Sequence, residues 1–490
     1  MRCLISRVIP LIFSWSLVVS AQDAGLALRT SVGYNTQRAS LPLTDQQRQE
    51  AERLGREAQQ AAQAGKFGEA MRDYYHGIAV MHNVAWTPGY EMASSLHGTL
   101  DHAMVEPGQQ VTLTLSPYFP TAASGTALTA SVSLVPAKGT SDDGKTLASA
   151  LKLDAASLPF HTQLTLPAST TGDFNISVKL VADGEVAILR EMPVHIESLS
   201  DAAQKLQSRL RKNKKETAAV ATAEYALVLY NRADQGDLNP GRYNFREEFT
   251  DANALVDAVD QHRDPFAGKH GDFRKAYRSS VDNSVQPYRL LIPASYDGTK
   301  PLPLLVALHG MGGDENSMFD GYHEALKREA ERVGFITVCP KGRDTASMYR
   351  ASAEQDVLDV IAEVKRDYRV DSRRIYLMGH SMGGYGTWSV AMNHPDLFAA
   401  LGPISGGGDT SGLGKIKAIP EYVVHGDNDK TVNVVQSRRM VEAGKLLGIA
   451  ITYVEVPGGS HVSVAEPAFS GMLDFFAKQQ KGGDSAVKTQ

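Results

Sequence analysis

The sequence predicts an α/β fold with a doubly wound, mostly parallel sheet in the C-terminal half of the chain, and two observations support this class. First, short apolar runs typical of strands buried on both faces recur there. These predicted strands are 288–293, 304–308, 335–338, 375–378, 400–404, 422–424 and 453–456. Second, amphipathic runs alternate with them, as parallel crossover connections require. These predicted helices are 324–333, 353–368, 382–393, 436–447 and 466–478.

Length and composition limit the class of protein. A chain of 490 residues is too long for one core, so two to four domains are expected. Apolar residues make up 42% and charged residues 21%, which is the balance of a globular protein. A net charge of -5 does not favour nucleic acid or an anionic membrane surface as a partner.

Residues 1–21 are predicted to be a signal peptide. Arg2 and Arg7 supply the positive start, an apolar run follows, and Val19-Ser-Ala21 has the small residues that signal peptidase needs. The apolar run of about twelve positions is shorter than the roughly 20 that cross a bilayer, although a retained anchor is an alternative. We therefore expect an exported protein, periplasmic or extracellular, with no membrane span in the mature chain.

The N-terminal half is predicted to contain two kinds of structure. Residues 22–94 are helical in character beyond a loose lead-in at 24–41, with Thr44 or Asp45 as a cap. Residues 95–198 change to short alternating runs separated by turn residues, which suits a small immunoglobulin-like β-sandwich. The predicted strands of this sandwich are 111–115, 128–135, 164–166, 174–181 and 186–196. A structural spacer is favoured over a carbohydrate-binding module, because the segment shows no aromatic stripe.

Helical and α/β segments complete the domain order. Residues 199–263 are predicted to be a helical linker region, with helices at 201–230 and 249–259. Residues 264–480 form the predicted catalytic domain, and residues 481–490 a disordered tail. Cys339 is the single cysteine after signal removal, so it can form no internal disulfide and is expected to be a buried thiol.

The segment Gly379-His-Ser381-Met-Gly383 is the strongest chemical signal in the chain. It follows a predicted strand and precedes a predicted helix, which is the context that the G-x-S-x-G pattern requires. A serine at such a sharp turn exposes its hydroxyl, and flanking glycines avoid backbone clashes. Ser381 is therefore the predicted nucleophile.

A serine hydroxyl needs a base, and the expected order along the chain is Ser, Asp, His. Asp429 lies on the loop after the strand 422–424, and His461 follows the strand 453–456 in the loop Pro457-Gly-Gly-Ser-His461. His461 would accept the proton of Ser381, and Asp429 would orient His461. Asp427 is the alternative to Asp429, and His425 is the alternative base, although a histidine that ends a buried strand is usually structural.

Two backbone N–H groups are predicted to form an oxyanion hole. One is that of Met382, directly after the nucleophile. The other is that of Met311, in the loop His309-Gly-Met-Gly-Gly313 that follows the strand 304–308. A phosphate cradle is the alternative for this loop, but the Gly-Lys-Ser/Thr ending is absent.

These segments resemble the bacterial α/β-hydrolase carboxylesterase group that includes feruloyl esterases, polyhydroxyalkanoate depolymerases and dienelactone-hydrolase relatives. The matching segments lie at 286–293, 308–310, 368–371, 374–386 and 403–406. The resemblance implies an α/β-hydrolase fold and triad roles for Ser381, Asp429 and His461. Members of the group often carry an aromatic residue soon after the catalytic histidine, whereas Val462-Ser-Val464 follows here.

The predicted function is a serine carboxylic-ester hydrolase with an acyl-enzyme intermediate. No organic cofactor and no metal is expected. The short spacing between the triad residues leaves no room for a large lid, which suits a small-molecule or polymer-linked ester in an open cleft. A peptidase related to prolyl oligopeptidases is one alternative, although it would need a repeated β-propeller. A catalytically inactive binding or scaffold protein is the other.

Overall fold

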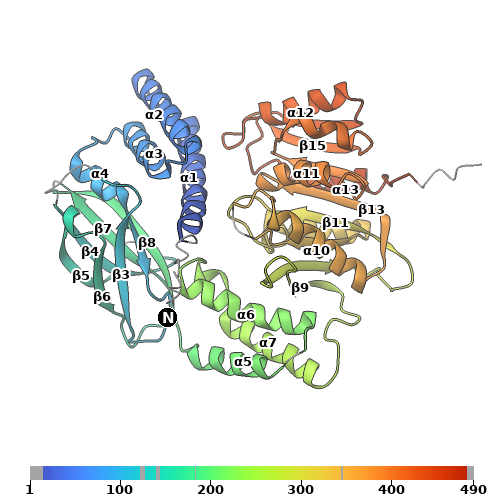
Figure 1. The fold of residues 1–490 in the computed structure, drawn as a ribbon, viewed down its shortest axis with the longest axis horizontal. Helices are drawn as coiled ribbons and strands as arrows, with labels where there is room; N and C mark the ends of the chain where they lie inside the picture. The colour runs from blue at the N-terminus through green and yellow to red at the C-terminus, as the bar shows by residue number, and fades with distance from the viewer. Residues whose placement is uncertain are drawn as a thin grey trace, which may run out of the picture. The chain divides into compact units, whose positions relative to one another are not determined.

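The computed structural model describes residues 15–482 except 122–126, 140–143, 183, 214 and 344–345. The chain divides into two compact units (Figure 1). The N-terminal unit contains residues up to Ser198 together with Asn231–Tyr243. The hydrolase unit contains Leu199–Tyr230 and the chain from Asn244 onward. Most of the predicted signal peptide, residues 1–14, lies outside the described residues, as do residues 483–490 of the predicted tail.

Four helices open the N-terminal unit: α1 Trp15–Ser40, α2 Asp45–Gln63, α3 Phe67–Met81 and α4 Pro88–Ser95. Thr44 caps α2 in a capping box with Gln47, as the sequence indicated. The loose lead-in expected at 24–41 is wrong, because residues 24–40 belong to α1. Tyr34 of α1 is buried among α2 and α3, with its ring against Gly55 and Gly77. Tertiary burial therefore stabilises a helix that has little periodicity of its own.

Two sheets follow, and they share one core. The first has the order β1-β3-β6 and the second the order β2-β8-β7-β4-β5. Their strands are β1 Leu96–Leu100, β2 Met104–Val105, β3 Gln110–Pro117, β4 Ala127–Pro136, β5 Lys145–Asp154, β6 Phe160–Thr165, β7 Gly172–Ala182 and β8 Glu185–Ile196. Leu113 from the first sheet and Val132 and Ile176 from the second are fully buried in that core. All five strands predicted from alternation are present, while β1, β2 and β5 were missed.

The helical region predicted as a linker packs into the hydrolase unit instead. It contains α5 Ser200–Lys212, α6 Ala218–Asp234 and α7 Phe245–Asp260, so the single helix expected at 201–230 is broken between α5 and α6. Val220 of α6 and Val259 of α7 are buried in the same core as the main sheet. The end of α6 belongs to the N-terminal unit, where Ala103 N donates to Asp234 O over 2.8 Å and His102 Nδ1 lies 2.8 Å from Asp234 Oδ2.

The main sheet has eight strands in the order β16-β15-β14-β13-β11-β12-β10-β9. Its strands are β9 Gly271–Arg278, β10 Val285–Ile292, β11 Leu302–Leu308, β12 Ile336–Pro340, β13 Val370–His380, β14 Ala400–Ile404, β15 Glu421–Gly426 and β16 Ile451–Val456. Strands β11 to β16 pair in parallel, and β10 pairs antiparallel with both β12 and β9. The seven predicted strands are all present, and β9 is the strand that the apolar pattern missed.

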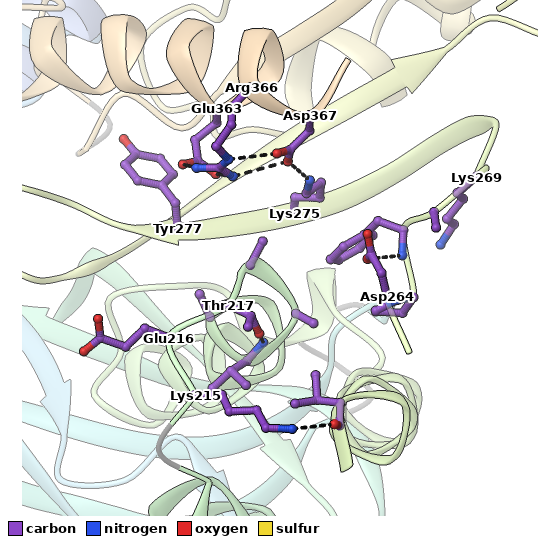
Figure 2. A pocket seen from close by; sticks show the side chains of 18 of the residues that line it. Lys215, Glu216, Thr217, Asp264, Lys269, Lys275, Tyr277, Glu363, Arg366 and Asp367 are labelled. Carbon is purple, nitrogen blue, oxygen red and sulfur yellow. Dashed lines mark hydrogen bonds and ion pairs between the residues drawn. The ribbon is translucent and has the colours of Figure 1, made fainter. Parts of the chain in front are cut away.

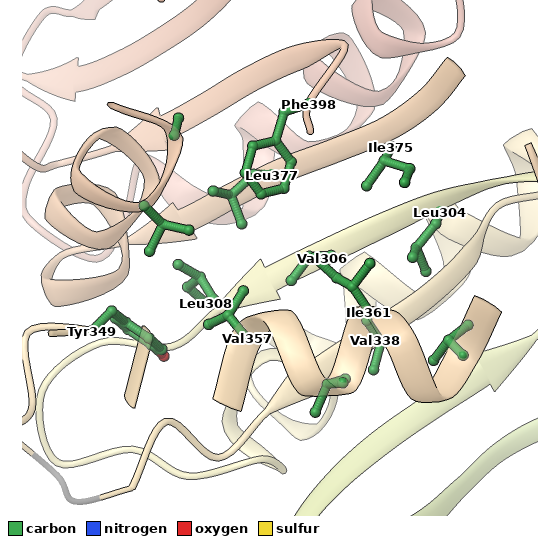
Figure 3. Close-up of a cluster of buried hydrophobic side chains, with 14 of the residues drawn as sticks. Leu304, Val306, Leu308, Val338, Tyr349, Val357, Ile361, Ile375, Leu377 and Phe398 are labelled. Carbon is green, nitrogen blue, oxygen red and sulfur yellow. The ribbon is translucent and has the colours of Figure 1, made fainter. Parts of the chain in front are cut away.

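Helices cover both faces of this sheet, which confirms the doubly wound α/β-hydrolase fold. They are α8 Ser317–Asp320, α9 Ala325–Val333, α10 Ser352–Asp367, α11 Met382–Asn393, α12 Val435–Leu446 and α13 Ala465–Phe476. On one face, Leu304, Val306 and Leu377 pack with Val357 and Ile361 of α10 (Figure 3). On the other face, alternate residues of the same strands pack with α9 and α13. Cys339 is a buried free thiol of this second core, and burial raises its pKa.

Within the described residues, no helix is both long enough and apolar enough to span a bilayer.

Candidate active site

Ser381 lies at the sharp turn between β13 and α11. Its backbone has φ 59° and ψ −117°, a conformation that costs free energy in any residue with a side chain. The backbone is tightly packed at this turn. A Cβ added to Gly379 would lie 2.4 Å from Gly383 O, and one added to Gly383 would lie 2.1 Å from Leu308 O. Both glycines of the pattern are therefore required by the backbone, and the turn lifts the Ser381 hydroxyl above the end of the sheet.

The three residues predicted as a triad come together at the carboxyl edge of the sheet. His461 Nε2 is 2.8 Å from Ser381 Oγ. His461 Nδ1 is 2.7 Å from Asp429 Oδ2. Each residue follows a parallel strand, namely β13, β15 and β16, so the sheet itself brings three distant segments to one edge.

Asp429 is a buried carboxylate with several donors. Its Oδ1 accepts from the N–H groups of Thr431 and Val432, each at 2.8 Å. Its Oδ2 accepts from His461 and lies 3.2 Å from His425 Nε2. Burial by itself would raise the pKa of Asp429, but the hydrogen bonds from His425 and His461 outweigh it and hold the pKa well below its usual range. The carboxylate is thus charged and fixed in orientation.

The alternative carboxylate, Asp427, has another place in the structure. It is exposed, and its Oδ1 accepts from Gly458 N at 2.7 Å. This bond ties the loop after β15 to the loop after β16, which carries His461. The alternative base, His425, is fully buried, and its Nε2 lies 3.2 Å from Asp429 Oδ2, whereas it is His461 that contacts Ser381 Oγ. The ring of His425 therefore contacts the carboxylate and not the serine.

Two further side chains hold the backbone of His461. His380 Nε2 donates to His461 O at 2.8 Å, and Ser405 Oγ donates to the same oxygen at 3.2 Å. Because a carbonyl only accepts, His380 Nδ1 must be the acceptor for the Tyr322 hydroxyl, 2.8 Å away. Burial, followed by the nearby His461, lowers the pKa of His380 to about 4, so His380 is neutral. The sequence predicted none of these three contacts.

The loop after β11 lies against the nucleophile. A Cβ added to Gly310 would be 3.3 Å from Ser381 Cβ, so a larger residue would crowd the nucleophile. The buried ring of His309 contacts the carbonyl oxygens of Gly310 and Lys341 at 2.8 and 2.7 Å and fixes the start of the loop. Met311 N–H follows directly. Met382 N–H is the first of α11, and the first N–H groups of a helix have no partner within it.

The end of the same loop carries a buried carboxylate that the sequence did not indicate. Glu315 is fully buried, and neither of its oxygens has a hydrogen-bond partner among the described residues. Arg274 Nε of β9 lies 3.5 Å away, and Arg274 also contacts Glu248 of α7 at 2.7 Å. Burial raises the pKa of Glu315 against the opposing charge of Arg274. Arg274 of β9 thus contacts both Glu248 of α7 and Glu315 in the loop that carries Met311.

The described part of the hydrolase unit contains at least two cavities. One of about 1620 Å³ is lined by α6, α7, β9 and the end of α10, and Figure 2 shows Lys275 and Asp367 paired on its wall. None of the described residues that line it belongs to the predicted site. The other, of about 690 Å³, is lined by Tyr322, Val462 and Glu466 among others. Val462 is 59% exposed and follows His461, so this smaller cavity adjoins the predicted site.

No group of three or more His, Cys, Asp or Glu side chains that could hold a metal ion occurs in the part of the chain that the structure describes.

Residues 282–439 match the sequence model of the family described as "Putative esterase". The match includes Ser381 and Asp429 and ends before His461. Among curated proteins, a bifunctional acetylxylan esterase/xylanase of Neocallimastix patriciarum is 33% identical over 137 residues. A probable feruloyl esterase C of Aspergillus oryzae is 28% identical over 187 residues. This part of the chain is therefore similar to the α/β-hydrolase esterase group.

The matches cover limited shares of each protein. The match to the Neocallimastix enzyme covers 27% of this chain and 20% of that enzyme, and the match to the Aspergillus enzyme covers 36% and 68%. Among solved structures, a thermostable esterase is 18% identical with a TM-score of 0.41, over 78% of this chain and 100% of the other. The family and relatives support a carboxylic ester hydrolase.

Proposed function

We propose that this chain is an exported serine carboxylic-ester hydrolase in which Ser381, His461 and Asp429 form the catalytic triad. The observation that carries the proposal is the unbroken pair of hydrogen bonds, 2.8 Å from His461 to Ser381 and 2.7 Å from His461 to Asp429. A histidine held in this way has one nitrogen free to accept the serine proton. Export rests on the signal peptide predicted at residues 1–21, and it remains a prediction.

The proposed reaction has two halves. His461 Nε2 takes the proton of Ser381 Oγ, which attacks the ester carbonyl. The N–H groups of Met382 and Met311 donate to the resulting oxyanion, and the dipole of α11 adds to this stabilisation. When the intermediate collapses, protonated His461 gives its proton to the leaving alcohol, and the acyl group stays on Ser381. Water then attacks the acyl-enzyme by the same steps and releases the acid.

The substrate class follows from the relatives and from the site. The relatives that match include a bifunctional acetylxylan esterase/xylanase and several feruloyl esterases, so we propose esters of a small aliphatic or aromatic acid. The cavity beside Val462 adjoins His461, and we propose that the alcohol part of the ester extends toward it. Because the alcohol extends out of the site, it can be either a small molecule or part of a polymer.

The peptidase alternative would need a propeller of repeated four-stranded blades. In the described part of the N-terminal unit, the strands form one three-stranded and one five-stranded sheet. This arrangement favours the esterase. The scaffold alternative is tested with a fluorophosphonate probe, because an inactive scaffold would not be labelled at Ser381.

The decisive test is Ser381→Ala with p-nitrophenyl acetate as the substrate. We expect kcat to fall roughly 10⁶-fold, because the variant has no nucleophile. Circular dichroism should remain unchanged. Ser411→Ala is the matched control, since Ser411 is exposed and contacts Asp409 outside the site. Turnover by Ser381→Ala at more than 1% of the control rate would refute the triad.

A further inference from the structure

The contacts of His425 suggest a role beyond packing. His425 lies near the end of β15 and is fully buried. Its Nε2 is 2.9 Å from Val432 O and 3.2 Å from Asp429 Oδ2. Its Nδ1 is 2.7 Å from Ser437 Oγ of α12. The ring therefore bridges the triad carboxylate and a helix on the other side of the strand end.

The partners of this ring fix the position of one proton. Val432 O and the charged Asp429 Oδ2 can only accept, so Nε2 of His425 must carry a hydrogen. Ser437 Oγ also lies 3.0 Å from Gly406 O. If the Ser437 hydroxyl donates to Gly406, then Nδ1 of His425 donates as well and the ring is positively charged. If the hydroxyl donates to Nδ1, the ring is neutral. In both cases Nε2–H lies between Val432 O, its nearer acceptor at 2.9 Å, and Asp429 Oδ2 at 3.2 Å.

We propose that His425 is a positioning residue that tunes the catalytic base by donating to the same oxygen of Asp429 that holds His461. Oδ2 then has two ring N–H groups near it, that of His461 at 2.7 Å and that of His425 at 3.2 Å. The bond from His425 draws negative charge away from the bond to His461, so Asp429 stabilises protonated His461 less strongly. His461 thus stays neutral, and able to accept a proton, down to a lower pH. This inference rests on the proposed triad.

A structural role alone does not account for this contact. Asp429 Oδ1 is already held by two backbone N–H groups, so its orientation does not depend on His425. What His425 adds is an N–H group close to Oδ2, which reduces the negative charge that Asp429 presents to His461. It should therefore appear in the pH dependence of the reaction.

Other titratable groups near His425 and Asp429 keep the same protonation state across neutral pH. Burial holds the pKa of His380 at about 4 and raises the pKa of the Tyr385 phenol, which lies near Asp429. Glu455 pairs with His425 across β15 and β16. The hydrogen bond from Arg438 is the largest of the effects on Glu455 and lowers its pKa to about 2. A change in the acid limb of the rate profile should therefore report the contact between His425 and Asp429 and not a neighbouring group.

The test uses two variants of His425 with amide side chains. One amide NH₂ group takes the position of Nδ1 and the other takes the position of Nε2. In His425→Asn the amide lies where Nδ1 was, so the contact with Ser437 is kept and the donor to Asp429 is lost. In His425→Gln the amide reaches the position of Nε2, so the donor to Asp429 is kept. The profile of kcat/KM against pH is measured with p-nitrophenyl acetate.

We expect His425→Asn to move the acid limb up by about one pH unit, the size of one hydrogen bond to a charged group. We expect His425→Gln to restore the wild-type limb to within about 0.3 units. His394→Gln is the control, because His394 pairs with Glu354 at the far end of α11 and should leave the limb unmoved. Equal acid limbs in His425→Asn and wild type would overturn the inference.

A second measurement needs no variant. In wild-type protein with ¹⁵N-labelled histidine rings, Nε2 of His425 should be protonated from pH 5 to pH 9, and a bare Nε2 would overturn the inference even if His425→Asn fails to fold. The proposed function is separable from this result. Loss of turnover in Ser381→Ala together with an unmoved acid limb would leave the triad standing and remove the role of His425.

Discussion

The two ends of strand β15 each carry a buried carboxylate, and the two are in opposite states. Glu421 begins the strand and is 1% exposed, while Asp429 follows its end and is 8% exposed. Asp429 has donors on both oxygens, and its pKa lies well below its usual range. Glu421 accepts one bond, from Trp388 Nε1 at 3.0 Å, and its Oε1 has no partner among the described residues. Burial raises the pKa of Glu421 to about 7.

The comparison shows that burial does not decide the charge of a carboxylate in this fold. The number of donors decides it, because each hydrogen bond to the anion offsets part of the cost of removing it from water. The carboxyl end of β15 opens into a loop whose N–H groups surround Asp429. At the amino end, the indole of Trp388 is the only hydrogen-bond donor to the carboxyl group among the described residues. The carboxyl end of β15 therefore keeps Asp429 ionised, whereas Glu421 at the amino end gains and loses its proton near neutral pH.

The largest expected effect comes from Asp429→Asn. We expect kcat to fall about 10⁴-fold, because asparagine carries no charge and its amide favours the wrong tautomer of His461. The fold should persist, since the amide oxygen can still accept from Thr431 and Val432 N–H. Steady-state kinetics on an acetyl ester measure the effect. Asp427→Asn is the control, and a larger loss there than in Asp429→Asn would reverse the assignment of the triad acid.

An intermediate effect is expected for Glu421→Gln, on stability and not on rate. The folded pKa of about 7 exceeds the usual 4.5, so the folded state binds more protons than the unfolded state between these values. The free energy of unfolding of the wild type, minus that of the variant, should therefore fall by about 3 kcal/mol as the pH rises from 4.5 to 7. Urea unfolding across this range measures it.

Glutamine keeps the acceptor for Trp388, so the two proteins should be about equally stable at pH 4.5. Glu442→Gln is the control, because Glu442 is exposed on α12 and should leave the pH dependence unchanged. Parallel stability curves for wild type and Glu421→Gln would mean that Glu421 is ionised in the fold, and the contrast between the strand ends would disappear.

The smallest effect is expected for Trp388→Phe, which removes the single donor to Glu421. A hydrogen bond to a charged group contributes roughly 1.5 kcal/mol, so the pKa of Glu421 should rise by about one unit. The fall in the free energy of unfolding should then continue to a pH about one unit higher than in the wild type. A double-mutant cycle with Glu421→Gln isolates this coupling from the cost of the smaller ring. A pH dependence that survives in the double variant would point to another group.

The residues that the sequence located best are those with a fixed place in the topology. Ser381, Asp429 and His461 each follow a parallel strand, and parallel strands end at one edge, so a motif and an order along the chain were enough to bring them together. Met311 and Met382 follow from the same rule through their backbone positions, and their roles remain proposals.

Residues that act across the fold were out of reach of the sequence. The contact of Tyr322 with His380 spans 58 positions, and that of His380 with His461 spans 81. No local pattern marks such pairs. His425 was considered and set aside as structural, because a histidine that ends a buried strand shows its neighbours only in three dimensions. Helix α1 and strand β9 were missed for a similar reason, since tertiary packing outweighs weak local patterns.

The path of the chain has a consequence for how the protein can be divided. The chain leaves the N-terminal unit after Ser198, returns to it for Asn231–Tyr243, and leaves again. A fragment that begins at residue 264 would lack the α6 and α7 side chains that fill the core of the sheet. A fragment that begins at residue 199 would carry Asp234 without its partners. No single cleavage of the chain separates the two units intact. We therefore expect the hydrolase unit to fold only when it is expressed together with the N-terminal unit.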